Sequence, residues 1–159
     1  MKTFTSTQTV LLDKLSNDEH DMMERSLDYL AYPDAESTTH EEVETYIASA
    51  MGIALNTLPP RICQMLLEWR SSGRRPGVII IDNLPTDPDL PPTPIDGKRC
   101  PDKITGISEL ILTGIAGLLG QPFSFAAERD GQLIQDLAPV KGKQQALTNE
   151  GAARLGFHT

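Results

Sequence analysis

Four consecutive β-branched residues divide this chain into a helical first half and a second half of different character. The run Val78–Ile81 lies between Gly77 and Asp82, and an unbroken apolar run of this length predicts a strand buried on both faces. The segment Pro85–Pro101 that follows holds six prolines, which fit neither a helix interior nor a strand ladder. We therefore expect an extended connection across the surface. A proline-motif ligand is the weaker alternative, because basic residues flank the prolines only at 98–99.

Three helices are predicted before the β-branched run. Ser16 and Thr39 are each followed three residues later by a glutamate, which is the capping-box pattern of a helix start. The first helix is expected to end before Pro33 and the second at Gly52. A third follows the proline pair at 59–60. Its apolar face is formed by Ile62, Met65, Leu66 and Trp69.

The second half predicts one more helix and a set of short strands. The helix is expected from Thr105 to Gly120, almost wholly buried, with Gly114 and Gly117 allowing another element to approach closely. The uncharged stretch Leu110–Ala127 contains glycines and a proline, so we interpret it as helix, turn and strand rather than as a membrane span. A turn is expected at Asp130–Gly131. The predicted strands are Phe123–Ala126, Gln132–Leu137 and Arg154–His158.

Strands that follow helices define an α+β class. We expect an N-terminal helical region at residues 1–76 and a second part at 77–159, within one domain of ordinary size. The net charge of -8 comes entirely from residues 1–50, which carry 11 acidic and three basic residues. A chain without a basic stripe is a poor ligand for phosphate backbones, so no nucleic acid partner is expected.

Compartment and chemistry are constrained by what the sequence lacks. Cys63 and Cys100 are too few for a disulfide framework, and the polar, Thr-rich first ten residues do not form a signal peptide. A cytoplasmic protein is therefore expected, with no membrane partner. Neither a Ser-His-Asp arrangement nor a phosphate-binding glycine loop is visible. His20 and His40 lie among acids at helix starts and are interpreted as solvated or capping residues.

His158 ends the last predicted strand, where Leu155 and Phe157 alternate toward one face and the histidine points to the other. From periodicity alone it is an ordinary surface group. However, the run Leu155-Gly156-Phe157-His158-Thr159 resembles the L-x-F-H-T-E segment of the clavaminate synthase-like branch of the iron(II)/2-oxoglutarate oxygenases. Four upstream segments also match the order and spacing of bacterial asparagine, arginine and lysine hydroxylases of that branch: 105–120, 120–123, 133–139 and 144–149. The resemblance covers roughly the last two-thirds of the chain.

This resemblance implies the N-terminal helices and first strands of a double-stranded β-helix (jelly-roll) oxygenase core, incomplete in this chain. It also implies a facial triad of two histidines and a carboxylate that holds Fe(II) beside 2-oxoglutarate and dioxygen. His158 matches the first ligand. The family's glutamate would come directly after Thr159, and the distal histidine and the 2-oxoglutarate-binding arginine would lie farther on. The implied activity is hydroxylation of an L-amino acid, namely asparagine, arginine or lysine, at Cβ or Cγ.

The same resemblance assigns three substrate-binding positions. Glu128 matches an acidic or amide side chain that faces the α-amino group of the substrate, and Asn149 a polar side chain near the same head group. Leu147 would present its backbone there. Without the resemblance, Glu128 is a solvated strand-end acid beside Arg129 and Asn149 is a turn residue. The polar segment 141–151 is expected to form a mobile flap over the site.

A second hypothesis is a non-catalytic, acidic helical interaction module or an inactive oxygenase fragment. It rests on the absence of a second metal ligand from the sequence. Under the first hypothesis, the partner of this chain is the remainder of the same oxygenase chain.

Overall fold

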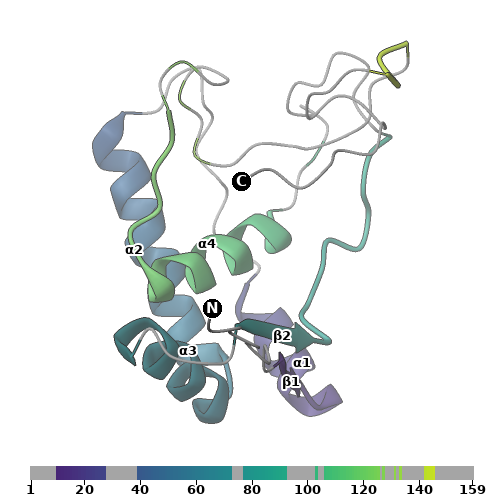
Figure 1. The fold of residues 1–159 in the computed structure, drawn as a ribbon. Helices are drawn as coiled ribbons and strands as arrows, with labels where there is room; N and C mark the ends of the chain where they lie inside the picture. The colour runs from purple at the N-terminus through teal and green to yellow at the C-terminus, as the bar shows by residue number, and fades with distance from the viewer. Residues whose placement is uncertain are drawn as a thin grey trace, which may run out of the picture. The chain divides into compact units, whose positions relative to one another are not determined.

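The computed structural model describes residues 10–27, 39–72, 77–92, 103, 106–125, 127, 131, 133 and 142–145. The chain forms two compact units, one made of Met1–Asp87 with Thr105–Pro122 and the other of Pro88–Ile104 with Phe123–Thr159. The described helices and strands all belong to the first unit (Figure 1). In chain order they are β1 (Val10–Lys14), α1 (Asn17–Ser26), α2 (His40–Thr57), α3 (Pro60–Ser72), β2 (Val78–Asp82) and α4 (Ile107–Leu119).

The two predicted capping boxes are confirmed. At the start of α1, Glu19 N donates to Ser16 Oγ at 3.3 Å, and Ser16 N donates to Glu19 Oε2 at 2.8 Å. At the start of α2, Glu42 N donates to Thr39 Oγ1 at 3.3 Å, and Thr39 N donates to Glu42 Oε2 at 2.7 Å. Each box satisfies two backbone N–H groups that have no partner inside the helix.

Helix α2 does not stop at Gly52, so that prediction is wrong. The helix continues to Thr57 because the following turn buries Ala54 and Thr57. It ends at Leu58, whose extended conformation is the one favoured before a proline. Helix α1 ends earlier than expected, at Ser26, and Pro33 lies outside the described residues.

Strand β1 was not predicted. It pairs with β2 in parallel, in a register that runs from Val10 opposite Val78 to Lys14 opposite Asp82. The sheet of described residues has only these two strands, and its apolar side chains remain open: Val10 is 55% exposed, Leu12 67%, Val78 43% and Ile80 46%. The expectation that 78–81 is buried on both faces is therefore wrong for the described structure, because no further element covers this face.

The connection after β2 is also more buried than predicted. Pro85 is fully buried and Asp87 is only 6% exposed. The N-cap of helix α4 is Gly106, which makes no side-chain cap. Instead, Asp87 accepts hydrogen bonds from Ile107 N at 3.0 Å, Ser108 N at 3.1 Å and Ser108 Oγ at 2.5 Å. A carboxylate 20 residues earlier in the chain thus caps α4.

Helices α2 and α4 cross at the two glycines, as predicted (Figure 1). A Cβ added to Gly114 would lie 2.6 Å from Ala50 O and 2.9 Å from Ala54 Cβ, and one added to Gly117 would collide with Met51. Most of α4 is buried, although Leu112 is 62% exposed. The predicted face of α3 buries Ile62 and Leu66 but leaves Trp69 36% exposed. The largest fully buried side chains are Leu15, Met23, Ile62, Leu66, Pro85 and Leu110.

The described part of the second unit does not confirm the strand predicted at 123–126. Residues 123–125 form no strand, and the rings of Phe123 and Phe125 meet edge to face at 5.5 Å while both stay largely exposed. Ser124 Oγ donates to Gly131 O at 2.6 Å, and Gly131 has a φ of 76°, which suits the predicted turn. The strand predicted at 154–158 lies outside the described residues, as does that at 132–137 except for Leu133.

Candidate functional site

The four predicted site residues, His158, Glu128, Leu147 and Asn149, all lie outside the described residues. The structure therefore neither brings them together nor separates them. Within the predicted flap at 141–151, residues 142–145 are described and form a turn in which Gly142 has a φ of 91°.

One group of potential metal ligands occurs among the described residues. His20, Asp21 and Glu24 of α1 place ligand atoms within 4.8 Å of one another. The group is partly or fully exposed and contains one histidine, whereas a facial triad requires two. His20 Nδ1 lies 3.3 Å from Asp21 Oδ1, which agrees with the solvated role predicted for this histidine. The described residues thus do not provide the donor set of the implied iron site.

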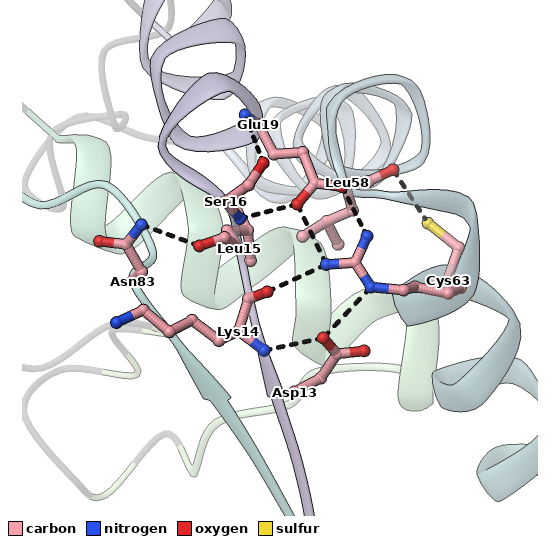
Figure 2. Close-up of polar contacts among 9 residues, drawn as sticks. Asp13, Lys14, Leu15, Ser16, Glu19, Leu58, Cys63 and Asn83 are labelled. Atoms are coloured by element: carbon pink, nitrogen blue, oxygen red, sulfur yellow. Dashed lines mark hydrogen bonds and ion pairs between the residues drawn. The ribbon is translucent and has the colours of Figure 1, made fainter.

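A polar cluster around Arg61 of α3 connects three elements (Figure 2). Arg61 donates to Glu19 Oε1 at 2.5 Å and Oε2 at 3.0 Å, to Asp13 Oδ1 at 3.2 Å and to Lys14 O at 3.0 Å. The Arg61 hydrogen bond is the largest cause that lowers the pKa of Glu19 to about 2, with the Ser16 backbone N–H contributing as well. Glu19 in turn raises the pKa of Arg61. The cluster joins the end of β1 to the starts of α1 and α3.

The ends of the two strands are held together beside this cluster. Asn83 has a φ of 61°, a conformation that asparagine tolerates better than most residues. Its Nδ2 donates to Leu15 O at 3.0 Å (Figure 2), and Leu15 N donates to Asp82 O at 3.1 Å. Both bonds fix the point where β1 and β2 end.

Cys63 is not a nucleophile in this arrangement. It is buried, its Sγ lies 3.8 Å from Leu58 O, and burial raises the pKa of its thiol. A thiol kept protonated in apolar surroundings is chemically inert. The polar contacts around Arg61, Asn83 and Cys63 therefore hold the strands and helices in place and have a structural role.

The chain is similar in fold to solved structures of non-haem iron oxygenases. An asparagine oxygenase in complex with Fe(II), (2S,3S)-3-hydroxyasparagine and succinate matches with a TM-score of 0.68 and 25% identity, over 89% of this chain and 43% of that chain. The non-haem iron oxygenase OrfP in complex with Fe matches in fold with a TM-score of 0.68 and 23% identity, over 88% of this chain and 42% of that chain.

Curated sequence relatives of this chain are named as amino acid oxygenases and hydroxylases. The L-asparagine oxygenase of Streptomyces coelicolor is 33% identical over 66% of this chain and 32% of its own length. The enduracididine beta-hydroxylase of Streptomyces hygroscopicus is 30% identical over 81% and 39%. The L-ornithine/L-arginine 3-hydroxylase of Catenulispora acidiphila is 31% identical over 80% and 36%. No protein-family model matches.

These relatives confirm the resemblance to amino acid hydroxylases that the sequence predicted. The chain spans about a third of the length of the curated relatives it matches. Four helices and a two-stranded sheet are described, so a jelly roll is not part of the described structure. In that part of the chain, no helix is long and apolar enough to cross a bilayer.

Proposed function

We propose that this chain forms the N-terminal part of an iron(II)- and 2-oxoglutarate-dependent oxygenase that hydroxylates an L-amino acid. The observation that carries the proposal is the agreement among the relatives. Three curated relatives, each at least 30% identical, are amino acid oxygenases or hydroxylases, and a solved asparagine oxygenase matches 89% of the chain.

The proposed cofactors are Fe(II) and 2-oxoglutarate. The matching asparagine oxygenase was solved with Fe(II) and succinate, and succinate is what remains of 2-oxoglutarate after oxidative decarboxylation. Dioxygen is the second co-substrate. We assign His158 as one iron ligand, because it matches the first histidine of the family's facial triad. A carboxylate and a second histidine from later in the chain would complete the triad.

The proposed reaction places the hydroxyl group on Cβ of the substrate. The names of two relatives specify a beta-hydroxylase and a 3-hydroxylase, and the solved asparagine oxygenase holds 3-hydroxyasparagine. These descriptions agree on Cβ and differ in the side chain, and Cγ is the alternative, because OrfP was solved with (3R,4R)-dihydroxy-L-Arg, which carries hydroxyl groups on both carbons. Asparagine and arginine are the first substrates to test, followed by lysine.

Glu128 is proposed to bind the α-ammonium group of the amino acid, where each charge offsets the desolvation of the other. Asn149 and the backbone of Leu147 are proposed to bind the same head group. The segment 141–151 would cover the site. In this proposal the chain's own residues bind and orient the amino acid, and the iron centre supplies the oxidation when it is bound.

The exposed apolar face of β1 and β2 favours the proposal that these strands are part of a larger sheet. Parallel strands are rarely stable as an uncovered pair, and Leu12 and Ile80 remain 67% and 46% exposed. We propose that β2 belongs to a jelly-roll core that starts at 77–159, that the helical region at 1–76 precedes this core, and that β1 of that region pairs along β2 and extends the sheet. We propose a cytoplasmic location, where free amino acids and 2-oxoglutarate are available.

Iron binding tests the assignment of His158. The wild type, His158→Ala and His40→Ala are each expressed from the complete coding sequence. Each protein is then titrated anaerobically with Fe(II). His40 is an exposed histidine at the start of α2, so it controls for the loss of a histidine as such. Loss of stoichiometric binding in His158→Ala alone supports the proposal. A wild-type protein that binds no Fe(II) would favour the interaction module instead.

A further inference from the structure

The contact between α2 and α4 contains a methionine that packs directly on a glycine. A Cβ built on Gly117 would collide with Met51 Cγ and lie 2.7 Å from Met51 Sδ, with Ile47 Cγ2 next at 3.7 Å. The thioether of Met51 therefore occupies the space that any side chain at position 117 would need. Gly117 itself is buried, so this position has little room for additional atoms.

Met51 is intermediate in exposure among the methionines of the described residues. Met23 is fully buried, and Met22 is 53% exposed. Met51 and Met65 are partly buried. Met51 is thus partly exposed, and its Cγ and Sδ lie in the contact with α4. A small oxidant can reach a partly exposed side chain of this kind. A change in the packing of Met51 affects the contact between α2 and α4.

We propose that Met51 is a peroxide-sensitive contact, whose oxidation to the sulfoxide loosens α4 from α2. In this step an S–O bond forms as the O–O bond of hydrogen peroxide breaks. The sulphur gives up an electron pair, and the peroxide is reduced to water. The product is larger than the thioether and strongly polar, so it requires space and hydrogen-bond partners.

Neither requirement is met at the Gly117 contact. The flexible, apolar Met51 side chain fits against the bare backbone of Gly117, whereas a sulfoxide oxygen there would have to displace α4 or turn the side chain out to solvent. Because methionine sulfoxide is reduced enzymatically, the change is reversible. The proposal does not depend on the proposed hydroxylase function.

The test compares wild-type protein with Met51→Leu and Met22→Leu. Leucine keeps the apolar volume at position 51 and cannot be oxidised. Each protein is treated with increasing hydrogen peroxide, peptide mass spectrometry quantifies the sulfoxide at each methionine, and the thermal midpoint is measured. The midpoint of the wild type and of Met22→Leu is expected to fall in proportion to oxidation at Met51, and methionine sulfoxide reductases should restore it.

Met51→Leu is expected to keep its midpoint at peroxide doses that fully oxidise Met22. Three results would overturn the proposal. Met51 could stay unmodified at those doses, its oxidation could leave the wild-type midpoint unchanged, or Met51→Leu could lose stability to the same extent as the wild type. The correlation within the wild type keeps the test valid even if the leucine variant folds poorly.

Discussion

Replacing Gly114 by alanine tests how closely α4 approaches α2. The added Cβ would lie 2.6 Å from Ala50 O, 3.2 Å from Ala50 C and 2.9 Å from Ala54 Cβ. Two of these three atoms are backbone atoms of α2, which cannot turn aside as the end of a long side chain could. The substitution must therefore push the two helices apart.

The magnitude follows from two opposing effects. Alanine is more favourable than glycine in a helix interior by about 1 kcal/mol, while overpacking a close contact costs about 1–3 kcal/mol. Gly52 of α2 provides the matched control, because a Cβ added there meets nothing within 4 Å. Both variants gain the same helix propensity, so Gly114→Ala should be less stable than Gly52→Ala by the packing cost alone, about 1–3 kcal/mol.

Urea unfolding followed by circular dichroism measures this difference. Gly52→Ala is expected to raise the midpoint and Gly114→Ala to lower it or leave it near that of the wild type, with similar slopes. Equal stabilisation by both substitutions would refute the close approach of the helices at Gly114, and with it the packing that positions α4.

Three further predictions concern single side chains. Asp87→Ala should destabilise the protein by about 1–3 kcal/mol, since it leaves the buried N–H group of Ile107 and the part-buried N–H group of Ser108 without their acceptor, and hydrogen exchange at those two amides should accelerate; unchanged exchange would contradict the cap. The folded-state pKa of Glu19 is lowered from 4.5 to about 2, so its contribution to stability is fully present above pH 4.5 and lost as the pH falls toward 2. Arg61→Ala should reduce this dependence in acid unfolding curves, modestly because the pair is solvent-exposed, and an unaltered curve would count against the pairing. In the proposed enzyme, Glu128→Ala should weaken amino acid binding by about 3–5 kcal/mol if the charge pair is well desolvated, while 2-oxoglutarate binding, titrated anaerobically, stays the same; equal weakening of both would reject this role.

Features set by neighbours in the sequence were predictable. The capping boxes at Ser16 and Thr39 depend only on a glutamate three residues away, and both form as expected. The close approach at Gly114 and Gly117 was predictable because a three-residue spacing places both glycines on one face of a helix. The resemblance to amino acid hydroxylases was predictable too, because the upstream spacing agreed.

Features set by distant partners were not predictable. Strand β1 is a short segment, and its pairing depends on a strand that follows three helices. The cap of α4 comes from Asp87, 20 residues earlier, and the partners of Arg61 lie 48 and 42 residues away. Nothing near these residues in the sequence marks their partners, because the contacts arise only once the helices pack. The predicted end of α2 at Gly52 was wrong for the opposite reason. The local stop signal was present in the sequence, but burial of the turn that follows it overrides this signal.

Turnover is the most direct test of the central claim that this chain belongs to an amino acid hydroxylase. The protein, expressed from its complete coding sequence, is incubated in air with Fe(II), 2-oxoglutarate and L-asparagine, L-arginine or L-lysine. Mass spectrometry then measures the amino acid and the succinate formed. One of the amino acids is expected to gain a single oxygen atom on Cβ, with matching succinate, and omission of iron or of 2-oxoglutarate is expected to abolish the product. An iron-loaded protein that forms neither succinate nor a hydroxylated amino acid with any of these substrates would contradict the central claim.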